Sequence, residues 1–283
     1  MSDTININWK KLATRILLYF AVAFICLVIL YPYFVMAVTS LKTRGEIFDP
    51  NGALLPAKAV WSNFADIWTL APMAKYLLNS IIIATGSTII AMVCGIPAAY
   101  ALARMKFKGQ TAFLGFIIVS QMFAPVVLLI GIYKVIKMLS LTNTPLGLVF
   151  VNAAFNQAFT IWLLRGTFMS ISAEMEQAAT IDGCNRLQAM FKILLPVAAP
   201  GIVTTLIFIF INAWNEFTVA LCLMSTDTLK PMTVGINIFN GYNLIEWQYL
   251  FASSIVAIIP VVILFMSIEK NLTSGLTAGG VKG

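Results

Sequence analysis

The chain has 283 residues, of which 60% are hydrophobic and only 10% are charged, and its net charge at pH 7 is +7. An ordinary soluble domain carries about 25% charged and about 45–50% apolar residues, and a soluble fold of this size could not bury so many apolar side chains. The composition therefore excludes a soluble enzyme and predicts a protein that crosses a membrane several times. The chain contains no histidine, which excludes histidine-based acid–base catalysis and histidine metal sites.

Six long stretches with few or no charged residues divide the chain. Five of them hold no Asp, Glu, Lys or Arg over 22 to 28 residues, and the stretch between Lys192 and Asp227 holds only Glu216. A helix needs about 20 residues to cross the ~30 Å hydrocarbon core, and the runs are continuous rather than alternating, which argues against strands. The fold class is therefore all-α, a transmembrane domain over residues 16–268. Its six transmembrane helices are expected at about residues 16–38, 77–103, 111–133, 145–166, 199–224 and 248–268.

Basic residues indicate the orientation, because loops in the cytoplasm are enriched in Lys and Arg. If the N-terminus is cytoplasmic, 11 of the 18 basic residues fall in inside segments and 7 in outside segments. Arg104, Lys106 and Lys108 lie together in one short inside loop. We therefore expect residues 1–15 and the tail 269–283 in the cytoplasm. This bias explains the positive net charge without a nucleic-acid partner.

The inside loop at about residues 167–197 reads as two short helices. Ser172 can cap the first helix, and Glu174 and Glu176 lie in its first turns, where the helix dipole favours negative charge. Gly183 can end that helix in a left-handed conformation. Asn185 and the residue three positions later form a capping box for the second helix.

The second helix of this loop is expected to carry an apolar face, because four large apolar residues recur at helical spacing. These residues are Leu187, Met190, Phe191 and Leu194. A helical hairpin of this kind either binds a partner protein or packs on its own bundle, and the residue pattern leaves both alternatives open.

Glu216 is the only carboxylate inside a predicted span. A charged group there costs at least about 2.5–3.5 kcal/mol, so it should face a cavity or a partner group. Two interpretations stay open, a polar lining of a translocation path and an interhelical hydrogen bond. The candidate path residues near Glu216 or in neighbouring spans are Asn212, Trp214, Asn215, Asn152, Asn156 and Gln121.

Four stretches carry a resemblance to a known family. The segment Glu176–Cys184, EQAATIDGC, with Leu195, Pro196 and Pro200, resembles the EAA loop of type I ABC-importer permeases. The segments Ile161–Gly166, Ala213–Phe217 and Gly275–Gly283 are similar to the carbohydrate-uptake branch, and specifically to the smaller permease of maltose and oligosaccharide transporters. The resemblance extends from the first span to the last residue.

The resemblance implies the MetI-like permease fold and an ATP-driven importer in the bacterial cytoplasmic (inner) membrane. The implied partners are a second, homologous permease, a dimer of ABC ATPase subunits and an extracytoplasmic sugar-binding protein. The chain itself is then no enzyme and holds no cofactor, since ATP and Mg²⁺ bind to the ATPase subunits. The loop 172–196 would couple to the ATPase through Glu174, Glu176, Gln177, Ala178, Ala179, Asp182 and Gly183. The tail would reach the ATPase through Gly279, Gly280 and Lys282.

One departure from the family pattern concerns Gln177, which stands where the family has a glutamate before Ala-Ala. Glutamine can form hydrogen bonds but no ion pair. Either Glu176 or Glu174 compensates, or the ATPase of this system differs at the contact.

Other functions remain to be weighed against this one. Gly275 and Gly280 have the spacing of a phosphate-binding loop, but Val281 stands where that motif needs lysine. Within the same superfamily, glycerol phosphate or a polyamine could be the solute. A secondary transporter driven by an ion gradient through Glu216 is a second class. An intramembrane enzyme lacks a nucleophile and base within the spans.

Overall fold

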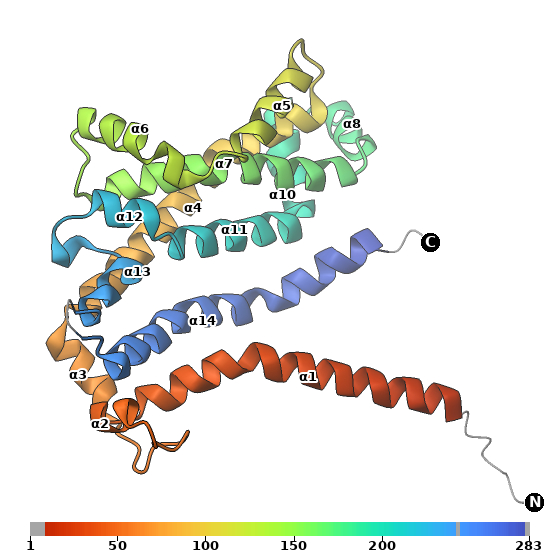
Figure 1. The fold of residues 1–283 in the computed structure, drawn as a ribbon. Coiled ribbons are helices and arrows are strands. Elements are labelled where there is room, and N and C mark those ends of the chain that lie inside the picture. The colour runs from red at the N-terminus through yellow and green to blue at the C-terminus, as the bar shows by residue number, and fades with distance from the viewer. Residues whose placement is uncertain (1–8, 242–243, 281–283) are drawn as a thin grey trace, which may run out of the picture. The chain divides into compact units, whose positions relative to one another are not determined.

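The computed structural model describes residues 9–241 and 244–280, with side chains for residues 14–241 and 244–267. Within these residues the backbone is almost wholly helical, and one isolated antiparallel bridge joins Asn240 to Ile245. The chain divides into two compact units, which are Met1–Leu70 with Phe239–Ile255, and Ala71–Ile238 with Val256–Gly283. Each unit is described here by itself (Figure 1).

Four helices among the described residues are long and apolar enough to cross a membrane. They are α1 (Trp9–Ser40), α4 (Met73–Arg104), α7 (Pro145–Ser170) and α14 (Trp247–Gly280). Two further candidates are bent pairs: α5 (Gln110–Ser120) with α6 (Pro125–Met138), bent by 102°, and Arg186–Val197 with α11 (Ala199–Trp214), bent by 80°. Counting each bent pair as one gives up to six candidate spans. The second pair differs from the expected span at 199–224, because it includes residues 186–197, which were expected in the loop, and ends at Trp214.

Two of the expected spans are therefore not straight helices. The expected span at 111–133 is interrupted before Pro125, which begins α6 and cannot continue the ladder of α5. The expected span at 199–224 breaks after Trp214, and a separate short helix, α12 (Thr218–Leu223), follows. Hydropathy is averaged over a whole span, so it registers neither a proline that follows apolar residues nor a pair of polar residues such as Asn215 and Glu216.

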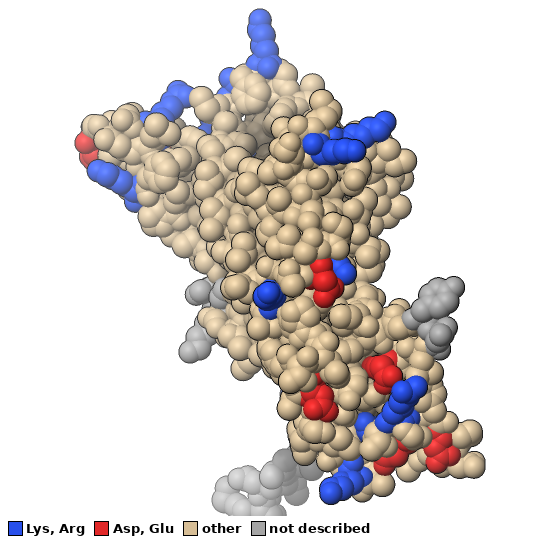
Figure 2. Space-filling model, turned by 90° about the vertical axis from the view of Figure 1, so that its left-hand side faces the viewer, with Lys and Arg blue, Asp and Glu red and all other residues tan. Residues whose placement is uncertain are grey.

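Large apolar side chains on the span helices remain exposed to the surroundings of the chain. On α1, Phe20 is 70% exposed and Leu27 is 69% exposed. Charged side chains are sparse on the face drawn in Figure 2, where most of the surface is uncharged. A surface of this composition is suited to lipid or to another membrane subunit rather than to water.

In the first unit, short helices follow the end of α1. Asn63, at the start of α3 (Ser62–Leu70), donates hydrogen bonds to the carbonyl oxygens of Ser40 (2.8 Å) and Lys42 (3.0 Å). Ser40 is the last residue of α1, and the carbonyl groups at the end of a helix have no hydrogen-bond partner within it. Thr43 caps α2 (Arg44–Phe48) through a reciprocal capping box. An ion pair of 3.1 Å joins Arg44 to Glu246.

In the second unit, α4 and α7 pack closely along their length and α11 packs on both of them. Ser87 on α4 donates to the carbonyl oxygen of Val149 on α7, at 3.2 Å. Gly95 on α4 faces the buried side chain of Thr160, whose hydroxyl donates to the Asn156 carbonyl oxygen. Small residues at such a crossing let two helix backbones approach each other.

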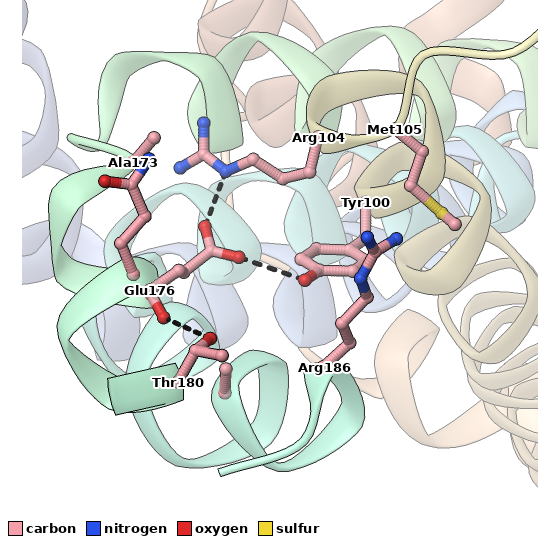
Figure 3. A pocket seen from close by; sticks show the side chains of 9 residues that line it. Tyr100, Arg104, Met105, Ala173, Glu176, Thr180 and Arg186 are labelled. Atoms are coloured by element: carbon pink, nitrogen blue, oxygen red, sulfur yellow. Dashed lines mark hydrogen bonds and ion pairs between the residues drawn. The ribbon is translucent and has the colours of Figure 1, made fainter. Parts of the chain in front are cut away.

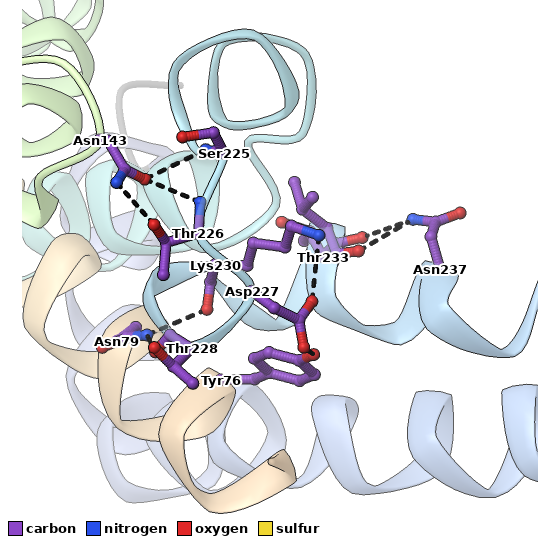
Figure 4. A network of polar contacts seen from close by, with 11 residues as sticks. Tyr76, Asn79, Asn143, Ser225, Thr226, Asp227, Thr228, Lys230, Thr233 and Asn237 are labelled. Carbon is purple, nitrogen blue, oxygen red and sulfur yellow. Dashed lines mark hydrogen bonds and ion pairs between the residues drawn. The ribbon is translucent and has the colours of Figure 1, made fainter. Parts of the chain in front are cut away.

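Four short elements complete the second unit and its boundary. After α12 come the 3₁₀ turn η2 (Asp227–Leu229), α13 (Met232–Gly235) and the 3₁₀ turn η3 (Ile236–Phe239). Tyr76, near the start of α4, donates to the Asp227 carboxylate at 2.8 Å, and Lys230 pairs with the same carboxylate at 3.0 Å (Figure 4). Asn79 donates to the carbonyl oxygens of Thr228 and Lys230.

A second set of contacts holds the other side of this segment. Asn143, in the turn between α6 and α7, has a φ of 57°. Its side-chain oxygen accepts from the amides of Ser225 (3.1 Å) and Thr226 (2.9 Å), and its amide group donates to the Thr226 hydroxyl. The segment after α12 is therefore fastened both to α4 and to the α6–α7 turn.

Gly95→Ala tests the close α4–α7 crossing. Alanine is normally better than glycine inside a helix by about 1 kcal/mol, but a Cβ at position 95 would overlap Thr160 Cγ2. We expect Gly95→Ala to destabilise the chain by about 1–3 kcal/mol, seen as a lower melting temperature in detergent. Gly131→Ala on α6 is the control, because no atom lies within 4 Å of its Cβ position. Equal melting temperatures for the two variants would contradict the packing.

Asp227→Asn tests the contacts around η2. Burial raises the pKa of the Asp227 carboxyl, but the hydrogen bonds from Tyr76 and Lys230 outweigh it and hold the pKa below its ordinary value. The charged form is thus favoured by folding, so its stabilisation is present above the unfolded pKa and is lost as the pH falls through the lower folded value.

The side chain of Asp227 is 44% exposed, so we expect a loss of at most about 1 kcal/mol at pH 7. That corresponds to roughly 2–4 °C in melting temperature. The difference between wild type and Asp227→Asn should shrink below about pH 4. A difference that stays constant down to pH 3 would show that the carboxylate charge does not stabilise the segment.

Candidate coupling loop and central cavity

The loop between α7 and α11 folds as two short helices, as its capping residues predict. α8 spans Glu174–Ile181 and α9 spans Arg186–Ala189. Gly183 separates them with a φ of 90°, a left-handed conformation that glycine adopts without strain. Asn185 and Gln188 form the predicted capping box, with reciprocal bonds of 2.8 and 2.9 Å.

The apolar face expected on the second helix is divided in the structure. Met190 and Leu194 are buried, whereas Leu187 is 65% exposed and Phe191 is 62% exposed. The reason is that residues Met190–Leu194 form a π-helical turn, η1, before α10 (Leu195–Val197). A π turn bonds residue i to i+5, so it rotates the following side chains away from the α-helical phase on which the expectation was based.

The residues assigned to coupling lie along α8 and in the turn that follows it. Five of the seven are exposed: Glu174, Gln177, Ala178, Asp182 and Gly183. Ala179 is buried against the rest of the loop. Ile181, at the end of α8, is 86% exposed, so the loop exposes a third large apolar side chain besides Leu187 and Phe191.

Glu176 differs from its neighbours because its carboxylate is held inside the chain. Arg104, at the end of α4, pairs with Glu176 Oε1 at 2.5 Å, and the Tyr100 hydroxyl donates to Oε2 at 3.0 Å (Figure 3). Arg104 also donates to the carbonyl oxygen of Ile171, which follows α7. A hollow of about 280 Å³ beneath α8 is lined by Tyr100, Arg104 and Glu176, together with Arg186. The sequence offers no local signal for this contact, because 72 residues separate its partners.

A larger cavity of about 430 Å³ lies among α5, α6, α7 and α11. It brings together five of the seven residues proposed for a translocation path. These are Gln121, Asn152, Asn156, Asn212 and Glu216. Asn152 and Asn156 are one turn apart on α7 and so share a face. Asn212 lies in the last turn of α11, and Glu216 follows the end of that helix.

Trp214 and Asn215 do not belong to this cavity lining. Trp214 is buried to 4% exposure, stacks on Phe210 with ring centroids 5.8 Å apart, and packs against Ala84. Asn215 is exposed and ends α11. The helical period explains the position of Trp214, because a residue two positions after Asn212 points to the opposite side of α11. It does not explain the position of Asn215, since residues three apart share a helix face.

Glu216 lines the cavity and also caps the short helix that follows the break after Trp214. Its two carboxylate oxygens accept hydrogen bonds from the backbone amides of Val219 (2.7 Å) and Ala220 (2.9 Å), which begin α12. Thr233 donates to the Glu216 carbonyl oxygen at 2.8 Å. The amides at the start of a helix lack intrahelical acceptors and favour negative charge, so this arrangement lowers the cost of a carboxylate in a span.

The remaining predicted residues are those of the C-terminal tail. Gly279 and Gly280 end α14, in the part of the helix whose side chains lie outside the described ones. Lys282 lies outside the described residues altogether. Within the described part of the chain, no group of three or more Cys, Asp or Glu is placed to hold a metal ion.

The fold and the site define a class, the membrane-embedded permeases of ABC importers. The structure is similar to a chain from the crystal structure of a bacterial ABC transporter involved in the import of the acidic polysaccharide alginate. The TM-score is 0.79 at 24% identity, over 92% of this chain and 97% of that chain. This likeness concerns the fold.

Sequence comparison identifies the family. Residues 91–277 match the model of the family described as "Binding-protein-dependent transport system inner membrane component", and the chain belongs to this family. It is 33% identical to the inner membrane ABC transporter permease protein YcjP of Escherichia coli, over 97% of this chain and 99% of that protein. It is 31% identical to the trehalose/maltose transport system permease protein MalG of Thermococcus litoralis, over 97% and 99%. The sulfoquinovosyl glycerol transport system permease protein SmoH of Agrobacterium fabrum is 35% identical, over 90% and 89%.

Substitutions at Gly183 test the turn between α8 and α9. No atom lies within 4 Å of a Cβ at this position, so the cost of a side chain comes from the left-handed backbone alone, about 1–2 kcal/mol for most residues. We expect Gly183→Ala to speed amide hydrogen exchange across α8 and α9, and Gly183→Asn to do so less, because asparagine tolerates this conformation better. Equal exchange in wild type and both variants would contradict the strain argument.

Proposed function

We propose that this chain is one of two permease subunits of an ATP-driven importer for an uncharged di- or oligosaccharide. An extracytoplasmic binding protein delivers the sugar, and a dimer of ABC ATPase subunits supplies the energy. The observation that carries the proposal is the cavity that joins Gln121, Asn152, Asn156, Asn212 and Glu216 in a chain of this family. Relatives named for trehalose and maltose, and for diacetylchitobiose, support a sugar as the solute.

The lining chemistry favours a neutral, hydroxyl-rich solute. Side-chain amides both donate and accept hydrogen bonds, and a carboxylate accepts them. Aromatic rings of Phe155 and Phe159 contribute apolar surface to the same lining. A volume of about 430 Å³ falls in the range of small-molecule sites, roughly 300–1,000 Å³.

The two other solutes considered within the superfamily fit this lining less well. The lining contains no Lys or Arg, so a glycerol phosphate dianion would find no cation there and would meet the charge of Glu216. A polyamine carries several positive charges, and the lining offers only the carboxylate of Glu216 to balance them. An uncharged sugar has neither mismatch.

The exposed surface of α8 and α9 is proposed as the ATPase contact. It combines the apolar side chains of Ile181, Leu187 and Phe191 with the polar groups of Glu174 and Gln177. Apolar side chains exposed together on a loop are typical of a protein interface. ATP and Mg²⁺ would bind to the ATPase subunits, and Gly279, Gly280 and Lys282 would contact them from the tail. In the bacterial cytoplasmic membrane, both termini would then face the cytoplasm.

Co-purification tests this assignment. The tagged chain, extracted in a gentle detergent from its native membrane, should bring with it one second permease and two copies of an ATPase subunit. A chain that purifies alone and imports solute in liposomes under an ion gradient, without ATP, would overturn the proposal. That result would favour a secondary transporter that uses Glu216.

The class of solute is tested with the reconstituted complex and its binding protein. We test maltose, trehalose and diacetylchitobiose as solutes. At least one of them should be taken up, and its uptake should depend on ATP. Glycerol 3-phosphate and spermidine serve as the charged alternatives. Uptake of either of these, without uptake of any sugar, would contradict the proposal for an uncharged sugar.

Two substitutions distinguish a residue that lines the cavity from a buried residue that only stabilises the fold beside it. Asn212→Ala removes an exposed amide from the cavity lining, so we expect a several-fold rise in the KM of uptake with an unchanged melting temperature, as for the loss of one hydrogen bond of about 1 kcal/mol. Trp214→Ala removes a buried side chain and should instead lower stability by about 3–5 kcal/mol. If Asn212→Ala leaves uptake unchanged, Asn212 does not line the path.

A further inference from the structure

We propose that the contact of Arg104 and Tyr100 with Glu176 is a strut that carries movement of α8 into α4 during transport. In this assignment, Glu176 and Arg104 are positioning residues that act within the permease, and Glu176 does not contact the ATPase. The inference rests on the proposed function, because it assumes that α8 receives its movement from an ATPase subunit.

The geometry joins three elements at one carboxylate. Tyr100 and Arg104 are one turn apart at the end of α4, so they lie on the same face of that helix. Each of them binds a different oxygen of Glu176, at 3.0 and 2.5 Å. Arg104 also donates to the Ile171 carbonyl oxygen at 2.8 Å, which ties in the end of α7.

The polar contacts from α8 to the spans are concentrated at Glu176. It packs mainly on α9 and η1, which belong to its own loop. Within the described part of the chain, the side-chain hydrogen bonds and ion pairs from α8 to a span helix all pass through Glu176. η1 in turn places Met190 and Leu194 in the buried cluster that holds Tyr100 of α4. α8 is therefore joined to α4 by an apolar route through η1 and by one polar route through Glu176.

The strut is shielded from water. The side chain of Arg104 is 14% exposed and that of Glu176 is 12% exposed, compared with 56% and 30% for the Arg44–Glu246 pair. Attraction between charges is stronger where water is excluded, and a partner left alone there is costly. Separation of α8 from α4 is therefore unfavourable, so the two helices should move together.

α4 is placed to pass the movement on. It spans 32 residues and packs on α7 and α11, the helices that supply Asn152, Asn156 and Asn212 to the cavity. At its other end, Tyr76 and Asn79 hold the segment around η2. One helix thus connects the loop, the cavity walls and the opposite end of the second unit.

The test uses the complete transporter in proteoliposomes, with its partner permease, ATPase and binding protein. The transported sugar is whichever of maltose, trehalose and diacetylchitobiose the wild type takes up fastest. Two quantities are measured for each variant: the amount of ATPase that co-purifies, and the uptake per ATP hydrolysed. The variants are Glu176→Gln, Arg104→Gln, Tyr100→Phe and the charge swap R104E with E176R. Lys106→Gln is the matched control, since it removes an exposed positive charge two residues from Arg104.

We expect Glu176→Gln and Arg104→Gln to keep the ATPase bound but to lower uptake per ATP by about tenfold. The charge swap should recover a large part of this loss, because it restores the pair with opposite polarity. Tyr100→Phe removes only a hydroxyl and should lower the ratio by about two- to threefold. Lys106→Gln should behave as wild type. If the single charge variants do not fold, the swap and Tyr100→Phe carry the test.

Three results would overturn the inference. Wild-type uptake per ATP in the folded strut variants would show that the strut carries no coupling, while the proposed function stands. Loss of ATPase binding in Glu176→Gln but not in Arg104→Gln would place Glu176 at the ATPase contact instead. A wild-type chain that recruits no ATPase would overturn the proposed function together with this inference.

Discussion

Helices in a bilayer gain little from burying apolar side chains against each other, because lipid tails are equally apolar, so close backbone approach must hold them together. In the second unit this condition is met where α4 crosses α7. Gly86 and Gly95 face Val149 and Thr160 there, and Ser87 bonds across to a carbonyl oxygen. Because α11 packs on both helices, this crossing sets where the polar residues of α7 and α11 meet. The cavity is therefore a consequence of small residues that do not themselves line it.

Two glutamates of the second unit are neutralised in different ways. Glu216 is bound by backbone amides at the start of α12, and Glu176 by the side chains of Arg104 and Tyr100. The amides are part of the backbone and cannot be lost without unfolding the helix end, whereas Arg104 reaches Glu176 from another helix. The first arrangement is local and static, and the second joins parts of the chain that are distant in sequence. Backbone amides suit the carboxylate of Glu216, which is held in place within its own segment. Side chains from another helix suit the carboxylate of Glu176, which joins α8 to α4.

The charge-free stretches predicted the spans, because water-excluded helices tolerate few charges, and the caps predicted α8 and α9. The breaks at Pro125 and after Trp214 were not predicted, since hydropathy reports composition and not continuity. Asn212 and Glu216 do line one cavity, although their four-residue spacing was argued for a continuous helix and α11 ends at Trp214. Trp214 was grouped with them as part of a motif, although its position on the helix already separated it. The contact of Arg104 with Glu176 depends on the tertiary fold and has no counterpart in local spacing.

The π-helical turn at Met190–Leu194 has a consequence for how this region tolerates change in chain length. A π turn holds one more residue than an α turn closed by the i to i+4 bond. It therefore corresponds to a single-residue insertion, which sets the phase between α9 and the entry to α11 at Ala199. Substitutions on its exposed side leave that phase intact, but removal of any one residue between Arg186 and Leu195 would rotate Leu187 and Phe191 relative to the span. In related chains, the number of residues between the glycine turn and the proline at 196 should therefore vary less than their identity.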